Sequence, residues 1–260
     1  DIFSNYTDYN SSTLALGTIF FAFQIYGDFS GYSDIAIGTA RLFGFNLMQN
    51  FSFPYFSRDI AEFWRRWHIS LSTWFRDYLY IPLGGSRGGT NTKIRNTFII
   101  FIVSGFWHGA NWTFIIWGAL NALYFLPLLL LNKNRKNMEF TTHTSVLTYL
   151  INLFKTIITF SLTCFAWIFF RAESLNHALD YISNLFTKTI FLKPEVLPIQ
   201  LIMILSTFIF IEWKSRHKEH VLANINEKYT TPLRWLLYFI IIIGIVLLAD
   251  EKQEFIYFQF

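Results

Sequence analysis

The sequence predicts an all-α, polytopic integral membrane protein with re-entrant and interfacial amphipathic helices, and its composition is the first reason. Of the 260 residues, 53% are hydrophobic and 20% aromatic, whereas only 15% are charged, against roughly 25% in a typical soluble domain. Too few charges remain to cover a soluble globule. The single cysteine excludes a disulfide scaffold and a cysteine-ligated zinc or iron–sulfur protein. We expect one membrane domain over residues 1–260.

Long apolar stretches are the second reason. A helix that spans a bilayer needs about 20 mostly apolar residues, and four stretches reach or approach that length, at 112–131, 146–170, 197–213 and 233–249. A fifth apolar block, 14–26, runs into a polar string that contains Asp28 and Asp34. A polar interruption at membrane depth must be buried or line a cavity. A polar lining and a cation site are both open for these two aspartates, but two aspartates six residues apart with no third ligand are poor evidence for a metal. We expect Asp28 and Asp34 among the substrate-binding residues.

The third reason is that residues 96–132 contain no Asp, Glu, Lys or Arg. At about 1.5 Å per residue, one helix of that length far exceeds a hydrocarbon core of about 30 Å, so the helix must break. Two glycines and an asparagine predict the break at 105–111, because these residues weaken a helix. Residues 97–107 are then expected to form a short or re-entrant element and 112–131 a full crossing. His108 lies at their junction, deep in the membrane.

Residues 58–79 are predicted to form one amphipathic helix that lies along the membrane interface. At about 100° per residue, the aromatic and aliphatic side chains fall on one side of this helix and the charged side chains on the other. Ser57 is the expected N-cap, and His68 falls on the apolar side, near its edge beside Trp64. The charged residues are Arg58, Asp59, Glu62, Arg65, Arg66, Arg76 and Asp77.

The distribution of basic residues predicts the orientation and the partners. Loops 132–145 and 214–232 carry more Lys and Arg than the loops on the opposite side, so the positive-inside rule places them in the cytoplasm. The net charge of +4 is spread between apolar blocks and never forms a run of five. This pattern favours contact with membrane lipid phosphates and not with nucleic acid.

Two of the six histidines are candidates for chemistry. His68 and His108 each lie among apolar residues, where desolvation lowers the imidazole pKa and keeps the ring neutral and basic. An ionisable residue inside a membrane is a functional hypothesis by default. The alternative for His108 is a core histidine satisfied by a carbonyl, and for His68 an ordinary boundary residue of an interfacial helix.

The other four histidines are not expected to act in catalysis. His143 and His177 are predicted to be solvated loop residues. His217 and His220 have H-x-x-H spacing, but they lie in a charged loop and no glutamate follows the first histidine to serve as a base. This arrangement does not favour a metal site, and we expect no bound metal.

Six short strings of the sequence occur together in a family-specific order. They are YGDFSGYSD at 26–34, NFSFPY at 50–55, FWRRWHISLS at 63–72, YIPLGG at 80–85, WHGANW at 107–112 and FIYFQF at 255–260. Together they closely resemble the bacterial branch of the membrane-bound O-acyltransferase (MBOAT) family, which includes enzymes that acetylate alginate and peptidoglycan. The resemblance covers nearly the whole chain. Because members of that family are considerably longer, it implies a C-terminal portion that lacks the family's N-terminal helices.

The resemblance implies a reaction and its residues. It matches His108 to the family's catalytic histidine and His68 to its second functional histidine. The implied reaction is acyl transfer, expected to move an acetyl group from a cytoplasmic donor such as acetyl-CoA or another acyl thioester, with no bound cofactor. The implied acceptor is an extracytoplasmic polysaccharide or an extracytoplasmic acetyltransferase partner protein. The implied location is the bacterial cytoplasmic (inner) membrane, with several crossings.

Further residues are expected to bind the substrate. The backbone N–H groups around Gly109 and the Asn111 amide are the nearest donors for the oxyanion of a tetrahedral intermediate, and Trp107 and Trp112 are expected to exclude water. Arg65 and Arg66, in the string 63–72, are also expected among the substrate-binding residues.

Two other classes of function make different demands on the sequence. A membrane transporter also places polar residues at broken helices near the midplane, and it remains the main alternative from the residues alone. A histidine-box desaturase or hydroxylase needs clustered His pairs on the transmembrane helices, and none occurs near His68 or His108.

Overall fold

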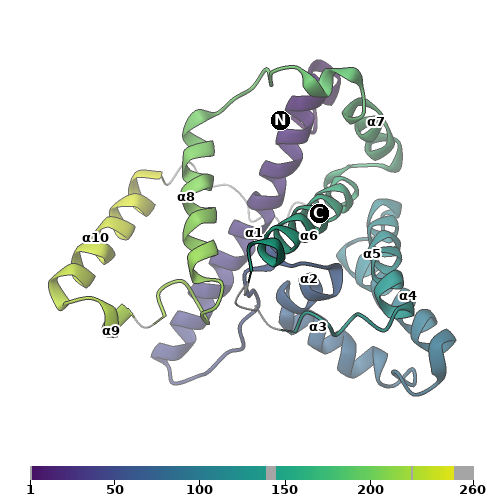
Figure 1. The fold of residues 1–260 in the computed structure, drawn as a ribbon, viewed down its shortest axis with the longest axis horizontal. Coiled ribbons are helices and arrows are strands. Elements are labelled where there is room, and N and C mark those ends of the chain that lie inside the picture. The colour runs from purple at the N-terminus through teal and green to yellow at the C-terminus, as the bar shows by residue number, and fades with distance from the viewer. Residues whose placement is uncertain (1, 139–144, 224, 249–260) are drawn as a thin grey trace.

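The computed structural model describes residues 2–138, 145–223 and 225–248, and within these ranges the secondary structure is helical, without strands. Figure 1 shows the arrangement of the helices. The α-helices are α1 (Ser11–Leu42), α2 (Ile60–Arg66), α3 (Ile69–Phe75), α4 (Gly89–His108), α5 (Trp112–Leu130), α6 (Val146–Arg171), α7 (Leu175–Leu185), α8 (Ile199–Ser215), α9 (Ile225–Lys228) and α10 (Thr231–Leu248). The shorter elements are η1 (Tyr6–Asp8), η2 (Pro54–Phe56), the π-helical turn η3 (Arg76–Tyr80) and η4 (Lys188–Phe191). His143 and the string 255–260 lie outside the described residues.

The helix α1 is continuous over 32 residues, so the polar string 28–34 does not interrupt it. Asn10 caps its start, because the Asn10 side chain accepts a hydrogen bond from the backbone N–H of Thr13 at 3.0 Å. Almost all buried residues of α1 lie before residue 27, whereas Asp34 is exposed. The polar string therefore occupies the less buried half of the helix, where glycine and aspartate are tolerated in a helix.

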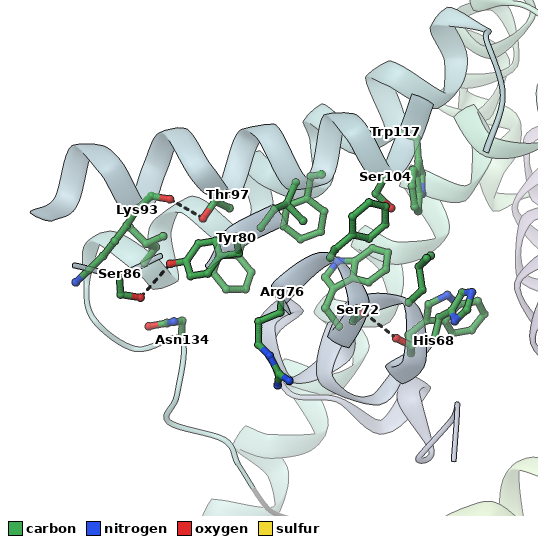
Figure 2. A pocket seen from close by; sticks show the side chains of 18 of the residues that line it. His68, Ser72, Arg76, Tyr80, Ser86, Lys93, Thr97, Ser104, Trp117 and Asn134 are labelled. Atoms are coloured by element: carbon green, nitrogen blue, oxygen red, sulfur yellow. Dashed lines mark hydrogen bonds between the residues drawn. The ribbon is translucent and has the colours of Figure 1, made fainter. Parts of the chain in front are cut away.

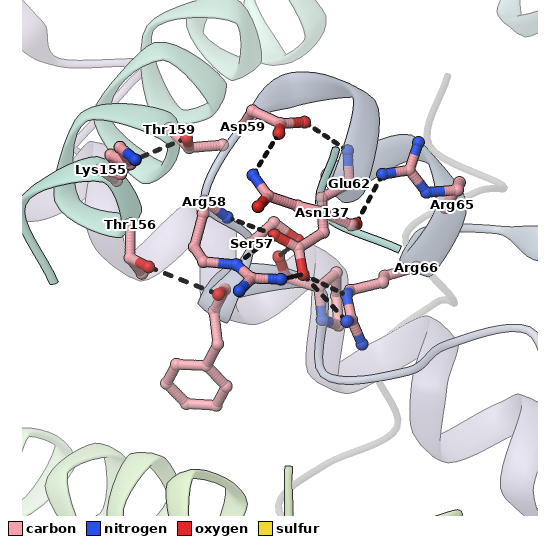
Figure 3. A network of polar contacts seen from close by, with 12 residues as sticks. Ser57, Arg58, Asp59, Glu62, Arg65, Arg66, Asn137, Lys155, Thr156 and Thr159 are labelled. Atoms are coloured by element: carbon pink, nitrogen blue, oxygen red, sulfur yellow. Dashed lines mark hydrogen bonds and ion pairs between the residues drawn. The ribbon is translucent and has the colours of Figure 1, made fainter. Parts of the chain in front are cut away.

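Residues 58–79 do not form one amphipathic helix, so that prediction was wrong. The chain forms α2, breaks at Trp67 and His68, and continues as α3 and η3. Three charged side chains in and just before α2 are also not in water: those of Arg58, Glu62 and Arg66 are 7%, 1% and 9% exposed. Spaced at i, i+4, these three side chains pair with one another (Figure 3), which allows their burial.

The predicted break within residues 105–111 is confirmed. The helix α4 ends at His108, and Asn111 caps α5, its side chain accepting a hydrogen bond from the backbone N–H of Thr113 at 3.1 Å. The upstream element is longer than predicted, because α4 begins at Gly89 and has 20 residues. The helices α4 and α5 then pack side by side as a hairpin (Figure 1).

Two glycines set the spacing of this hairpin. A Cβ atom on Gly105 would lie 2.2 Å from the carbonyl oxygen of Phe114, and one on Gly118 would lie 2.2 Å from the carbonyl oxygen of Phe101. Each helix therefore contacts the backbone of the other at a residue without a side chain. This close approach holds His108, at the end of α4, against α5.

The core is aromatic and centres on α6, which lies between α1 and α5 (Figure 1). Trp67, Trp117 and Trp167 come from three different segments, and each is 2% exposed. The Trp167 ring centroid lies 5.2 Å from that of Trp67 and 5.7 Å from that of Trp117. Ring contacts of this kind add about 0.5–1.5 kcal/mol each beyond area burial. They pack the break at Trp67 against α6 and, through Trp167, connect it to Trp117 on α5.

Among the described residues, two helices are long and apolar enough to cross a membrane, α5 and α6, and both match predicted crossings. The stretches predicted at 197–213 and 233–249 form α8 and α10, which are helical but shorter; residue 249 lies outside the described residues. Crossing by α8 and α10 stays a prediction. The helix α8 is tied to α1 by a buried hydrogen bond from the Tyr26 hydroxyl to Glu212 Oε1 at 2.6 Å.

We expect Gly118→Ala to destabilise the protein, because the added methyl group would displace the backbone of α4 at Phe101. Gly38→Ala on α1 is the matched control: its added Cβ has open space, and alanine is about 1 kcal/mol more favourable than glycine inside a helix. The midpoints of thermal unfolding in detergent should fall for Gly118→Ala and not for Gly38→Ala. Equal midpoints for the two variants would contradict the proposed close packing of α4 and α5.

Candidate active site

A cavity of about 580 Å³ lies between α3, the α4–α5 hairpin, α6 and the loop that follows α5. Both candidate histidines, His68 and His108, line it. Figure 2 shows α4 running along one side, with Lys93 and Ser86 at one end and His68 and Trp117 at the other. The two histidines are forty residues apart in the sequence, and the fold brings them to one cavity.

His68 is positioned by an unusual backbone. Its φ is 44°, in the left-handed region, where non-glycine residues are uncommon and often functional. Asn50 holds the following residues in place: its carbonyl oxygen accepts from the Ile69 N–H at 3.0 Å, and its side-chain oxygen accepts from the Ser70 hydroxyl at 2.6 Å. The chain therefore reverses direction locally, and the imidazole lies edge-on to Phe29, with ring centroids 4.7 Å apart.

The environment of His68 keeps its ring neutral. Burial lowers the pKa of the His68 imidazole from 6.5 to about 4, because a charged ring loses water that nothing replaces. The Ser70 hydroxyl lies 3.5 Å from Nδ1. A neutral imidazole can donate one hydrogen bond and accept another, which suits a group that orients a substrate.

His108 lies at the C-terminal end of α4 within a group of aromatic rings. Its ring centroid is 4.9 Å from those of Trp107 and Phe170 and 5.3 Å from that of Trp117. Trp117 and Phe170 are buried. The ring is therefore held by packing at a helix end, and helix ends leave backbone groups unsatisfied that a substrate can approach.

The other residues predicted around His108 do not line the cavity. Trp107 and Trp112 are 55% and 71% exposed on the outer surface of the hairpin. The Asn111 side chain caps α5 and also donates from Nδ2 to the carbonyl oxygen of Glu173 at 3.0 Å. The Gly109 N–H donates to the carbonyl oxygen of Phe106 at 3.2 Å. This arrangement lends no support to Asn111 and Gly109 as oxyanion donors, nor to the two tryptophans as cavity walls.

The remaining predicted binding residues also lie outside the cavity lining. Asp28 and Asp34 are on α1 and do not line it. Arg66 pairs with Glu62. Arg65 donates to the carbonyl oxygen of Asn134 at 2.8 Å and to that of Asn137 at 2.7 Å. Figure 3 shows the bond to Asn137. Arg65 therefore fastens the loop after α5, whose Asn134 lines the cavity.

Sequence reasoning missed the polar end of the cavity. Tyr80, Ser86, Lys93 and Asn134 lie at this end (Figure 2), and Arg135, which follows Asn134 in the chain, also lines the cavity. Lys93 and His108 are fifteen residues apart on α4, or about 22 Å along the helix axis. The sequence does contain an indication of this end. Lys93 and Arg135 lie on opposite sides of the charge-free stretch 96–132, and if that stretch folds as a helical hairpin, both residues lie at the same end of the hairpin.

His177 is not a solvated loop residue, as the sequence had predicted, but lies on α7. Its Nε2 is 2.9 Å from the carbonyl oxygen of Phe3, and its ring stacks on Tyr6 with centroids 5.0 Å apart. His177 thus joins the N-terminal segment to α7, and it does not line the cavity.

A model of the membrane-bound O-acyltransferase (MBOAT) family matches residues 6–170. This range contains both histidines, and almost all of the helices around the cavity fall within it. The chain belongs to the membrane-bound O-acyltransferase family. It is therefore a membrane protein.

The curated relatives are bacterial. The probable alginate O-acetylase AlgI of Pseudomonas aeruginosa is 47% identical over 163 residues, which cover 63% of this chain and 29% of that protein. The peptidoglycan O-acetyltransferase of Helicobacter pylori is 42% identical over 165 residues, or 64% of this chain and 30% of that protein. The teichoic acid D-alanyltransferase of Bacillus subtilis is 30% identical over 166 residues, or 60% and 40%. The matched part thus spans about a third of these relatives.

The lowered pKa of His68 predicts a pH-dependent stability. Between pH 6.5 and 4 the unfolded chain binds more protons at this residue than the folded chain, so the free energy of unfolding falls as the pH is lowered through this window. His68→Asn removes the titrating group and tolerates a left-handed backbone. Between pH 7.5 and pH 5, the thermal midpoint of the wild type should fall further than that of His68→Asn.

The control for this measurement is His220→Asn, at an exposed position away from the cavity. It should keep the pH dependence of the wild type. If His68→Asn and the wild type lose stability equally on acidification, His68 does not have a depressed pKa.

Proposed function

We propose that this chain forms the acyl-transfer centre of a bacterial membrane O-acetyltransferase that modifies an extracytoplasmic polysaccharide of the alginate or peptidoglycan type. The observation that carries the proposal is the convergence of His68 and His108 on one cavity with a basic polar end. The named activities of the relatives, two of which transfer acetyl groups, support it. They lend no support to a transporter.

The two ends of the cavity suggest where the substrates bind. Lys93 lies at the same end as Asn134 of the loop after α5, and Arg135, the next residue of that loop, also lines the cavity. The positive-inside rule assigns this loop to the cytoplasm. A thioester donor such as acetyl-CoA would enter there, with its anionic part near the two cations. The apolar middle of the cavity, with residues such as Phe101, would then exclude water from the thioester.

The chemistry proposed at the histidine end is direct acyl transfer. The oxygen of the acceptor hydroxyl attacks the carbonyl carbon of the thioester, and the hydroxyl proton passes to the neutral His108 imidazole. The resulting tetrahedral intermediate collapses as the C–S bond breaks, and the sulfur leaves as a thiol with the proton from the imidazolium. General base assistance of this kind is worth typically 10²–10⁴-fold. His68 orients the acceptor or the thioester.

The polysaccharide itself, or an extracytoplasmic acetyltransferase partner protein, would supply the acceptor hydroxyl. Location in the cytoplasmic membrane with several crossings follows from the same proposal. No bound cofactor or metal is required, because the donor brings its own activated bond.

The histidine pair is tested by single and double substitution. His108→Gln should reduce acetyl transfer by about 10²–10⁴-fold, because glutamine can keep a hydrogen bond but cannot accept a proton. His68→Ala should cost less, and the double variant should be no worse than His108→Gln, because groups that act in one step lose rate non-additively. The measurement is the O-acetyl content of exported glycan in cells that express each variant.

His220→Ala is the control and should retain wild-type acetylation. Western blotting of the membrane fraction checks that every variant is inserted. Substantial turnover by His108→Gln would show that His108 is a core histidine and that the base lies elsewhere.

The donor end is tested by charge removal. Lys93→Gln and Arg135→Gln should each raise the KM for acetyl-CoA in isolated membranes by about 5-fold to 10-fold, the loss of roughly 1 kcal/mol of partly screened attraction, with kcat little changed. Arg87→Gln is the matched control, because Arg87 is exposed and does not line the cavity. A KM that stays the same in both cavity variants would argue against donor entry at this end.

A further inference from the structure

Ser104 is a polar group of the cavity that the proposed mechanism has not used. It lies on α4 one turn before His108, and residues spaced i, i+4 share one face of a helix. It is 6% exposed and lines the cavity. Figure 2 shows its side chain projecting from α4 toward the aromatic rings at the histidine end, near Trp117.

The Ser104 hydroxyl is not committed to its own helix. Other helical hydroxyls donate to the carbonyl four residues earlier, as Thr97 on α4 itself does to Lys93 at 2.8 Å and Thr163 on α6 to Thr159 at 2.9 Å. No such bond, and no other side-chain hydrogen bond, occurs at Ser104 among the described residues.

The Ser104 oxygen is also not sealed within the packing. Within the described ranges, the fully enclosed side-chain polar atoms without a partner are Thr113 Oγ1, Trp167 Nε1 and Arg234 Nε. Ser104 Oγ is not one of them, so it keeps open surface, and the open space beside Ser104 is the cavity. A buried hydroxyl in contact with a substrate cavity is available as a hydrogen-bond donor.

Acyl transfer needs such a donor at this place. The oxygen of the thioester carbonyl becomes negatively charged in the tetrahedral intermediate, and donors set in advance stabilise that charge. The nearby donors expected from the sequence are occupied, because Asn111 Nδ2 and the Gly109 N–H bind other carbonyl oxygens. Ser104 supplies a hydroxyl on the face of α4 that carries the base.

We propose that Ser104 Oγ donates a hydrogen bond to the carbonyl oxygen of the bound thioester and to the oxyanion that forms from it. Ser104 keeps its proton throughout and forms no covalent bond, while His108 exchanges the proton of the acceptor. This inference rests on the proposed acyl transfer and adds a catalytic residue to it.

The test is Ser104→Ala in membranes that contain the intact protein and its partners, with acetyl-CoA as the donor. The kcat should fall by about 10²–10³-fold, the loss seen when one oxyanion donor is removed, while the KM for acetyl-CoA changes little. Ser215→Ala is the matched control, because Ser215 is also 6% exposed but lies on α8 and does not line the cavity. It should be indistinguishable from the wild type.

Two further measurements complete the test. If Ser104→Ala fails to accumulate in the membrane, Ser104→Cys replaces it, because a thiol is of similar size but only a weak donor, and a loss of kcat is again expected. Peptide mass spectrometry after brief incubation with acetyl-CoA asks whether Ser104 becomes acetylated.

Each outcome decides the inference. A wild-type kcat in Ser104→Ala overturns it and leaves the proposed function intact. Acetylated Ser104 also overturns it, since the residue would then act as a nucleophile. Absence of acyl transfer in the wild type itself overturns the proposed function, and the inference falls with it.

Discussion

The site depends on the ion pairs that the buried carboxylate of Glu62 forms with Arg58 and Arg66. The carboxylate accepts from the backbone N–H and the guanidinium of Arg58, at 2.8 and 3.0 Å, and pairs with Arg66 at 2.9 Å. Removal of one partner from such a buried group costs about 3–5 kcal/mol, because a charge is left unpaired. Arg66 also donates to the carbonyl oxygen of Ser52. The network thereby fixes both ends of α2 and the direction in which the chain enters the left-handed turn at His68.

The sequence predicted the parts of the fold that length and composition constrain. A charge-free stretch of 96–132 must break, and its glycines and Asn111 showed where. The prediction of one amphipathic helix over residues 58–79 was wrong, because a helical wheel assigns side chains to faces but does not show what packs against each face. Charges spaced at i, i+4 were assumed to need water, yet Arg58, Glu62 and Arg66 satisfy one another. The left-handed conformation of His68 had no sequence signal, since it depends on Asn50, eighteen residues earlier.

The candidate site was predictable only in part, for similar reasons. His68 and His108 were found because an imidazole in an apolar context has few ordinary roles. Asn111 was expected at the substrate, but a local N-cap satisfies its side chain first. The polar end of the cavity was missed because Lys93 and Arg135 are 42 positions apart and meet only through the α4–α5 hairpin. Ser104 was not predicted because the sequence does not show which helical hydroxyls lack a hydrogen bond within the helix. Only the structure shows this.

The glycine contacts of the hairpin have a consequence for motion. At Gly105 and Gly118 the two helices of the hairpin beside the cavity pack backbone against backbone, so no side chain there can change rotamer to make room. The opposite wall is α3 and the π-helical turn η3, which carry few buried residues. We therefore expect α3 and η3 to shift more easily than α4, the helix that carries His108, because α4 is held to α5 by contacts between their backbones.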